Sequence, residues 1–80
     1  MTIEQLRSVL EATPFQPFTL YMSDGRKARV PHRDYVAQSP SGRTIVVYHE
    51  DDTFSVLDMR LVTELKVQNG PTAGSKKRKS

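Results

Sequence analysis

Apolar and polar side chains alternate on both sides of an Asp-Gly pair in the segment Phe18-Thr19-Leu20-Tyr21-Met22-Ser23-Asp24-Gly25-Arg26-Lys27-Ala28-Arg29-Val30. A period of two residues is the pattern of a β-strand, and Asp-Gly is a strong signal for a tight turn between two strands. The sequence therefore predicts an antiparallel hairpin with strands at residues 18–22 and 26–30. The side chains expected to point inward are Phe18, Leu20, Met22, Ala28 and Val30.

The length of the hairpin loop determines which side chains face the core. A two-residue loop would place Leu20 opposite Arg29, and because opposed residues share a face, a cation would then point inward. A three-residue loop over residues 23–25, with Gly25 in the left-handed conformation, places Leu20 opposite Ala28 instead. We therefore expect the three-residue loop. It also produces an outward row in which Tyr21 pairs with Lys27 and Thr19 pairs with Arg29.

The residues before the hairpin carry the signals of a short amphipathic helix. Thr2 and Gln5 have the spacing of a capping box at the helix start. Pro14 disfavours the helical conformation of the residue before it, so the helix should end near Ala12. A helix of about ten residues is not stable alone, so its apolar face needs a partner surface. That face consists of Ile3, Leu6, Val9 and Leu10.

Three more strands are predicted after the hairpin. Pro31 should break or bend the second strand, and pairing should resume around residues 35–38. Residues 44–48 are apolar on both faces, which indicates either a strand of a barrel wall with the helix laid across it or a subunit contact. Strands are also expected at residues 53–57 and 61–67. Their inward side chains are predicted to be Phe54 and Val56 in the first, and Leu61, Leu65 and Val67 in the second.

This order predicts a mainly β fold with one N-terminal α-helix, in which a strongly bent, five-stranded antiparallel sheet closes into a small barrel. We expect a single helix-plus-barrel domain over residues 1–68. The remaining residues, 69–80, contain no apolar side chain larger than alanine, which predicts a disordered basic tail.

Positive charge is concentrated in that tail. The chain has 12 Lys and Arg residues against 9 Asp and Glu residues, a net charge of +3. Four of the cations are Lys76, Lys77, Arg78 and Lys79, so residues 1–70 have a net charge of −1. Any global attraction to phosphate should therefore belong to the tail, and the domain can add only a local basic patch.

The composition argues against several classes of protein. With 80 residues, no cysteine, no nucleophilic serine motif and no glycine-rich phosphate loop, the chain is not expected to be an enzyme or to act on a small-molecule substrate. His32 and His49 do not have the spacing of metal ligands, so we expect no metal and no cofactor. Without a run of about 18 apolar residues or a secretory signal, we expect no membrane span and a cytoplasmic location.

The segment Leu20-Tyr21-Met22-Ser23-Asp24-Gly25 resembles the first strand and turn of the Sm-like family, which includes the bacterial RNA chaperone Hfq. In that family two hydrophobic residues and a tyrosine precede an Asn-Gly or Asp-Gly pair. Residues 54–65 are similar to its fourth and fifth strands, and the likeness covers about residues 3–67. It implies an Sm-like or SH3-like barrel. Where Hfq holds RNA with a Tyr-Lys-His signature, this chain has Asp58-Met59-Arg60, so only Arg60 keeps a compatible cation. The chain is also similar to short bacterial proteins with an N-terminal helix, a Pro-Phe-x-Pro-Phe connector and an Asp-Gly turn.

Two functions are consistent with these features. The first is a non-enzymatic interaction module that self-associates or docks a protein partner, because a domain of about 65 ordered residues without disulfides or metals gains only about 3–5 kcal/mol from its core. Its candidate interface residues are Val46, Tyr48 and Val62.

The alternative is binding of RNA or single-stranded nucleic acid through a Tyr/Lys/Arg hairpin face and the tail. The same cations could instead protect an edge strand from aggregation, and the tail could serve only solubility. The candidate nucleic-acid-binding residues are Tyr21, Arg26, Lys27, Arg29, Arg33, Arg60, Lys76, Lys77, Arg78 and Lys79.

Overall fold

The Asp-Gly hairpin has the predicted register in the computed structural model, which describes residues 1–68. Strand β1 (Phe18–Met22) pairs antiparallel with β2 (Lys27–Val30), with Leu20 opposite Ala28. The Met22 N–H donates to the Arg26 carbonyl at 2.8 Å, and Gly25 has a φ of 91°. The three-residue loop with a left-handed glycine is therefore confirmed.

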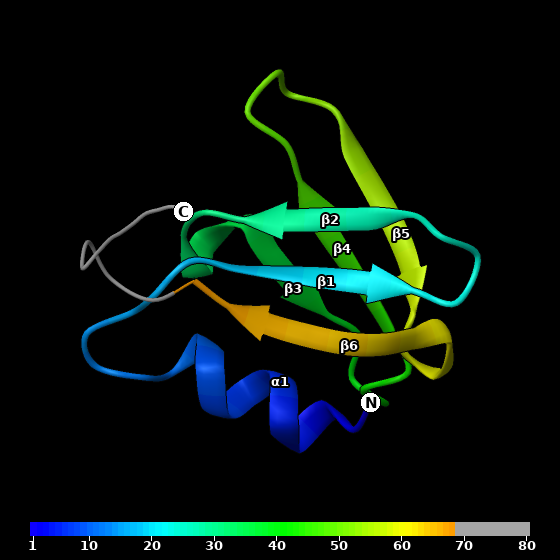
Figure 1. Ribbon diagram of the computed structural model, residues 1–80, viewed down its shortest axis with the longest axis horizontal. Coiled ribbons are helices and arrows are strands. Elements are labelled where there is room, and N and C mark those ends of the chain that lie inside the picture. The colour runs from blue at the N-terminus through cyan, green and yellow to red at the C-terminus, as the bar shows by residue number, and fades with distance from the viewer. Residues whose placement is uncertain (69–80) are drawn as a thin grey trace, which may run out of the picture.

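The strands form two three-stranded antiparallel sheets that cross each other (Figure 1). In the first sheet, β1 lies between β2 and β6 (Val62–Val67). In the second, β4 (Thr44–Tyr48) lies between β3 (Val36–Gln38) and β5 (Phe54–Asp58). The central place of β4 agrees with its apolar character on both faces.

The prediction of one bent, five-stranded sheet closed into a barrel is not confirmed, because the structure has six strands in two sheets that do not close. A 3-10 turn at Arg33–Tyr35 follows Pro31, so the chain leaves the first sheet after β2 and pairs in the second as β3. A second 3-10 turn, Met59–Leu61, returns the chain from β5 to β6. Proline cannot donate a ladder hydrogen bond, which accounts for the first break.

Helix α1 (Ile3–Leu10) has the predicted capping box. The Gln5 N–H donates to Thr2 Oγ1 at 3.3 Å, and the Thr2 N–H donates to Gln5 Oε1 at 3.1 Å. The helix ends two residues before the expected Ala12. It lies on the β6 side of the first sheet in Figure 1, and Leu6 is fully buried.

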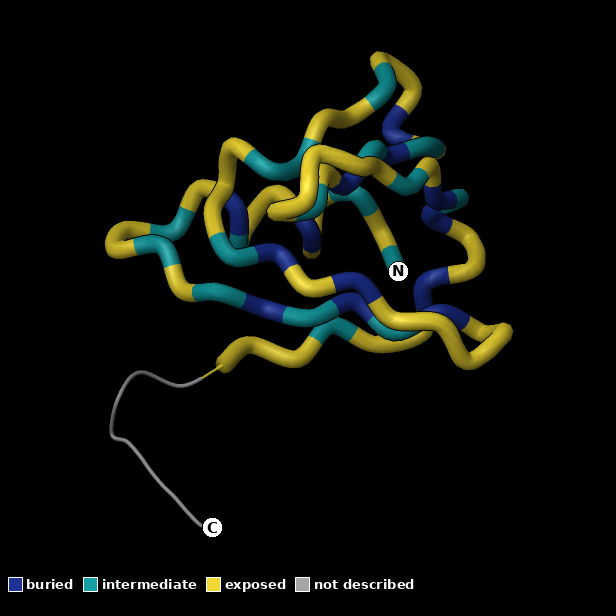
Figure 2. The backbone as a smooth tube through the Cα atoms, turned by 90° about the horizontal axis from the view of Figure 1, so that it is seen from above, coloured by how far each residue is buried: buried dark blue, intermediate teal, exposed yellow. Residues whose placement is uncertain are grey.

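Buried and exposed residues alternate along the strands, and the buried ones gather between the two sheets and α1 (Figure 2). This alternation confirms all five inward side chains predicted for the hairpin. The core residues are Leu6, Leu10, Phe18, Leu20, Met22, Ala28, Val30, Ile45, Val47, Leu57, Met59 and Val62.

Two predicted inward residues of β5 are in fact on the outside. Phe54 is 60% exposed and Val56 is 59% exposed, while Leu57 is buried. The register sets this, because Leu57 pairs with buried Ile45 and Val56 pairs with Val46 on the opposite face. Apolar residues occupy both faces of this strand in the sequence, so the sequence pattern alone could not show that the face with Leu57 is the buried one.

The prediction that Leu61 points inward is also wrong. The 3-10 turn holds Leu61 outside the strand, where it is 44% exposed, and Val62 pairs with Met22 in its place. A register shift between Tyr21 and Met22 accommodates the change. Leu65 packs against the core as predicted, while Val67 at the strand end is 38% exposed.

The predicted disordered tail, residues 69–80, lies outside the residues that the structure describes. Within residues 1–68, helix α1 is eight residues long, and no helix there has the length and apolar character to cross a membrane.

Candidate functional site

The outer side of the β3–β4–β5 sheet is an exposed apolar surface, which we call the apolar face. Its strands place Ala37, Val46 and Val56 side by side across the sheet, with Tyr48 opposite Phe54 in the next row. The Tyr48 and Phe54 rings lie 6.0 Å apart between centroids at an angle of 50°. Tyr48 is 46% exposed. The face therefore presents Tyr48, Phe54 and Val56 to solvent beside the half-buried Val46. The next row along the same face pairs Thr44 with the charged Asp58.

The two ends of the apolar face carry opposite charge. At one end, the β4–β5 loop holds Glu50, Asp51 and Asp52, which we call the acidic tip. The loop again has three residues, because the His49 N–H donates to the Thr53 carbonyl at 2.8 Å and Asp52 has a φ of 76°. The hairpin projects past β2 at the top of Figure 1.

Asp51 is fixed within this tip by its neighbour. Thr53 donates to Asp51 Oδ1 from its hydroxyl at 2.6 Å and from its N–H at 3.1 Å. These hydrogen bonds stabilise the carboxylate and lower the Asp51 pKa below its ordinary value. The Asp51 carboxylate is thus ionised at neutral pH.

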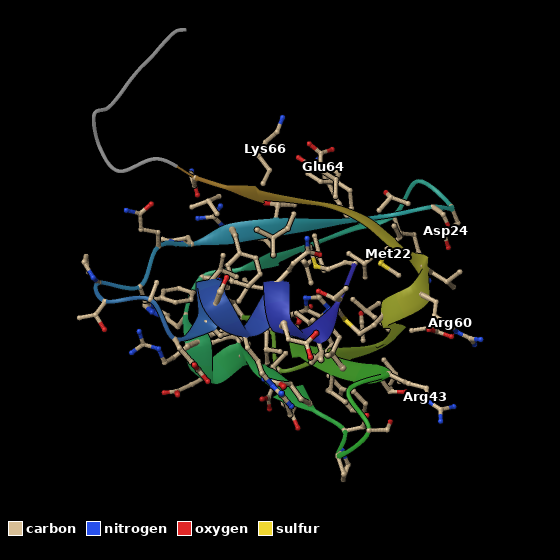
Figure 3. The ribbon with its side chains drawn as sticks, turned by 90° about the horizontal axis from the view of Figure 1, so that it is seen from below. Met22, Asp24, Arg43, Arg60, Glu64 and Lys66 are labelled. Atoms are coloured by element: carbon tan, nitrogen blue, oxygen red, sulfur yellow. The ribbon has the colours of Figure 1, made fainter. Side chains whose placement is uncertain are left out.

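At the other end lie Arg43 and Arg60, which we call the basic end. The Met59 N–H donates to the Arg43 carbonyl at 2.8 Å, and Figure 3 shows both arginines at the same end of the molecule. Arg60 Nη2 lies 2.8 Å from Asp58 Oδ2. The hydrogen bond from the Arg60 side chain, together with that from its N–H, lowers the Asp58 pKa to about 2, and the pairing raises the Arg60 pKa.

The outer side of the β2–β1–β6 sheet is the second candidate, which we call the basic face. Tyr21 lies between Lys27 and Glu64, and Thr19 lies between Arg29 and Lys66. The predicted outward row is confirmed, and β6 adds a third cation to it. Glu64 and Lys66 extend away from the body of the molecule in Figure 3. The residues that line a depression of about 360 Å³ here are Thr19, Tyr21, Lys27 and Arg29.

Sequence reasoning missed Lys66. The alternation along β6 placed Leu65 inward and so implied that Lys66 points outward, but no local signal shows which strand lies beside β1. Pairing of β1 with β6 joins residues 40 to 50 positions apart in the chain and is a tertiary outcome. The Arg29 guanidinium further donates to Gln68 Oε1 at 2.7 Å, which ties the end of β6 to β2.

Two other predicted cations form ion pairs outside the basic face. Arg26 pairs with Asp24 at 2.7 Å, and Arg60 pairs with Asp58 at the basic end. Hydrogen bonds from the Arg26 N–H and side chain lower the Asp24 pKa. Four predicted tail cations, Lys76, Lys77, Arg78 and Lys79, lie outside the described residues.

Arg33 is a clamp on the end of helix α1 rather than a member of the basic face. Its Nε donates to the Leu10 carbonyl at 2.8 Å, and its Nη2 donates to the Ala12 carbonyl at 2.7 Å. Its guanidinium carbon also lies 5.4 Å from the centre of the Phe15 ring. The last carbonyls of a helix lack intrahelical partners, and a cation there satisfies them.

The three predicted interface residues separate into two groups. Val46 and Tyr48 lie on the apolar face, and Val62 is 1% exposed in the core. The inward turn of Val62 follows from the 3-10 segment before it, so its side chain is not available to a partner in this fold.

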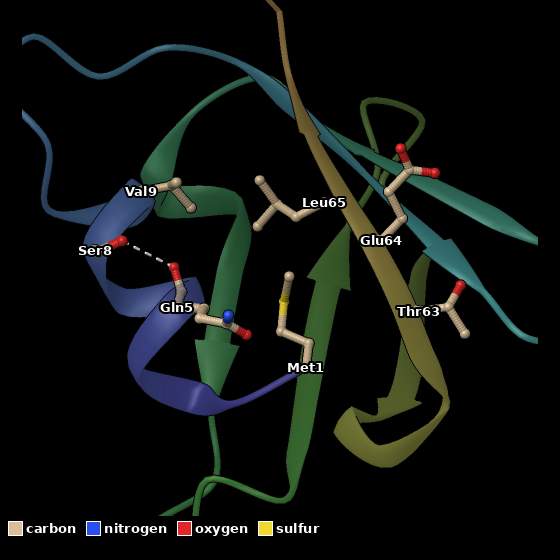
Figure 4. A pocket seen from close by; sticks show the side chains of 7 residues that line it. All are labelled: Met1, Gln5, Ser8, Val9, Thr63, Glu64 and Leu65. Carbon is tan, nitrogen blue, oxygen red and sulfur yellow. Dashed lines mark hydrogen bonds between the residues drawn. The ribbon is translucent and has the colours of Figure 1, made fainter.

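A groove of about 410 Å³ lies between α1 and β6 (Figure 4). Met1, Val9 and Leu65 point into it, while Thr63 and Glu64 point away from the helix. The three apolar side chains also pack against the core. The groove is therefore the seam at which the helix docks on the sheet.

One pair of polar side chains has the elements of a catalytic dyad. His49 Nε2 and Ser55 Oγ lie 2.9 Å apart across the β4–β5 hairpin. A nucleophilic serine also needs a carboxylate that orients the histidine, and the nearby Asp51 carboxylate accepts from Thr53 instead. Neither His49 nor Ser55 lines the depressions described above. Across residues 1–68, no three His, Asp or Glu side chains gather where they could hold a metal ion.

Comparison with protein family models, with curated proteins and with solved structures finds no match for this chain.

Proposed function

We propose that this protein is a non-enzymatic interaction module that binds protein through the apolar face. The observation that carries the proposal is the exposure of Tyr48, Phe54 and Val56 side by side on one sheet. Neighbouring apolar residues exposed on a small domain are characteristic of protein contact surfaces, and aromatic residues are enriched at the centres of such surfaces.

The position of these residues strengthens the proposal. Phe54 and Val56 could have been buried by a shift of one residue in the register of β5, yet the chain places the buried Leu57 and the half-buried Ser55 on the inner side instead. Ser55 is a polar residue in that inner row, so the fold places two larger apolar side chains in water. Exposing them costs stability unless a partner covers them.

A second part of the proposal concerns the type of fold that the two sheets form. We propose that the two crossing sheets are the halves of an Sm-like or SH3-like small barrel that stays open at its strand edges. The supporting observations are the resemblance of residues 20–25 to the Sm-like first strand and turn and the short 3-10 turn before the last strand.

Photo-crosslinking in the living cell tests the function. A photoreactive benzoylphenylalanine in place of Phe54 should give protein adducts on irradiation. The matched control carries the same group in place of Gln16, an exposed residue of the connector outside the apolar face. Absence of adducts at position 54, or equal yields at both positions, would contradict the proposal.

The basic face supports a second candidate function, binding of single-stranded nucleic acid. The specific observation is that β6 brings Lys66 beside the predicted row, so that Lys27, Arg29 and Lys66 flank Tyr21 and Thr19 against one acid, Glu64. A sheet with a central aromatic residue and cations on both sides can stack a base and neutralise the adjoining phosphates.

Fluorescence anisotropy with a labelled single-stranded oligonucleotide of mixed sequence tests this candidate. Lys27→Glu combined with Arg29→Glu should abolish binding, and removal of residues 71–80 should leave binding by the domain in place. Tyr21→Ala should weaken binding by about tenfold, since stacking on one base contributes about 1–3 kcal/mol. Glu64→Lys should strengthen it. If only removal of the tail lowers the affinity, the domain does not bind nucleic acid.

A further inference from the structure

We infer that the partner of the apolar face is a second copy of this chain, packed face to face with its β4 strand antiparallel to that of the first. This inference rests on the proposed function of the same face. It is carried by the opposite charges at the two ends of the face, which make the surface complementary to itself in one orientation.

The charge asymmetry runs along β4. The acidic tip has three carboxylates, whereas the basic end has two arginines and one carboxylate, Asp58. From Arg43 to Glu50 the chain advances seven residues, which is about 23 Å of extended strand. That separation exceeds the Debye length of about 8 Å at physiological salt, so the two ends hardly attract each other within one molecule.

A second copy turned by 180° brings opposite charges together. In a two-fold arrangement, the acidic tip of each copy meets the basic end of the other, and both contacts form at once. A copy in the parallel orientation would instead place tip against tip, where six carboxylates repel one another. The charge pattern therefore selects the antiparallel orientation.

The apolar residues fit the same arrangement. Val46 and Val56 lie at the middle of the face, so a two-fold axis through them packs aliphatic side chains against their own copies. The Tyr48 and Phe54 rings, next to the acidic tip, come over the basic end of the other copy. Arginine favours stacking on aromatic rings, so Arg43 gains a second kind of contact there.

The size of the face sets the strength of the contact. Phe and Tyr side chains bury about 150–250 Å² each, so the exposed fractions of Phe54 and Tyr48 amount to on the order of 200 Å² per copy. With the valines and the charged ends, the total buried by two copies is on the order of 1,000 Å², the low end for specific interfaces. We therefore expect a reversible dimer with a dissociation constant in the micromolar range.

Charge reversal tests the inference. One variant reverses the tip with Glu50→Lys and Asp51→Lys, and a second reverses the basic end with Arg43→Glu and Arg60→Glu. Sedimentation or light scattering over about 1 µM to 1 mM should show that each variant alone dimerises at least about tenfold more weakly than the original chain. An equimolar mixture of the two should recover dimers, because each now complements the other.

Two controls keep the result interpretable. Circular dichroism establishes that each variant folds, and Arg29→Glu, a charge reversal on the basic face, should leave the dimer unchanged. Val56→Asp, at a side chain that is already 59% exposed, should lower self-association by more than about a hundredfold, since it buries an unpaired charge at the centre of the contact. Weak dimers of each variant with recovery in the mixture support the inference. Dimers insensitive to both reversals would overturn it.

Failure of this inference differs visibly from failure of the proposed function. If the partner is a second copy, the photo-adduct at position 54 has twice the chain mass of 9.1 kDa. If the chain is a monomer up to 1 mM and forms adducts of another mass, the inference of a second copy is wrong but the proposal that the apolar face binds protein stands. If the chain is a monomer and forms no adducts, both the inference and the proposed function are wrong.

Discussion

Replacing Arg33 with alanine should destabilise the domain although the side chain lies at the surface. The Arg33 guanidinium donates to the carbonyls of Leu10 and Ala12 and stacks on Phe15. Hydrogen bonds that involve a charged group contribute about 1.5–3 kcal/mol when buried. The bond to Leu10 is partly buried and the bond to Ala12 is exposed, so the first takes the low end of that range and the second a fraction of it.

Stacking on Phe15 adds about 0.5–1 kcal/mol, and partial ordering of the arginine side chain opposes these gains by about 1 kcal/mol. The net loss in Arg33→Ala should therefore be about 1–2 kcal/mol, and each 1 kcal/mol lowers the melting temperature of a domain of this size by about 4–8 °C. Urea denaturation followed by circular dichroism measures the free energy of unfolding. Arg33→Lys keeps the charge but loses the two-point geometry, so it should recover less than half of the loss.

Arg29→Ala is the matched control, because its guanidinium makes one exposed hydrogen bond, to Gln68, and it should change stability by less than about 0.5 kcal/mol. A change of that small size in Arg33→Ala, or an Arg33→Lys variant as stable as the original chain, would refute the helix clamp. Arg33 would then be free to serve the nucleic-acid-binding role that the sequence suggested.

Two further predictions concern turns. Gly25 and Gly42 both have positive φ, so alanine should cost about 1–2 kcal/mol at either position. Gly42→Ala should cost more, because the added methyl would lie 3.1 Å from Ile3 Cγ2, while nothing lies within 4 Å at Gly25. Ile3→Ala should remove only part of the difference, because the Ile3 Cβ would stay 3.2 Å from the methyl, and equal urea midpoints for the two glycine variants would contradict the close contact. Arg60 holds the folded pKa of Asp58 at about 2, below the ordinary 3.8. Its stabilisation is therefore present above about pH 4 and lost as the pH falls towards 2, so Asp58→Asn should flatten the loss of stability over that window, and an unchanged acid profile would exclude the pairing.

Local patterns carried the prediction of the hairpin and the helix. The pairing of Leu20 with Ala28 followed from the need to keep Arg29 out of the core, and the helix start followed from the spacing of Thr2 and Gln5. These features depend on residues a few positions apart, where turn and cap geometry leave few alternatives.

The errors arose where the pattern was compatible with two structures. Strand β5 has apolar residues on both of its faces, so only its pairing with β4 decides that Leu57 is buried and Phe54 is exposed. The 3-10 turn that exchanges Leu61 for Val62 similarly depends on how the chain returns to β1.

The candidate sites show the same division. The row of Tyr21 and Lys27 was predicted from the hairpin alone, and its location is confirmed. The addition of Lys66 and the removal of Arg33 required knowledge of contacts between distant segments. The apolar face was only partly predicted, since Val46 and Tyr48 were chosen and Phe54 was assigned to the core.

The second sheet is continuous in sequence, which has a consequence during folding. Strands β3, β4 and β5 follow one another from residue 36 to residue 58, whereas β1 must wait for β6 to find its second neighbour. A partly folded chain in which residues 36–60 have taken up their structure already presents the surface that we expect to bind a second copy, before β6 has paired with β1. Such intermediates could meet through this surface before the first sheet is complete, so assembly and misassembly compete at the same stage of folding.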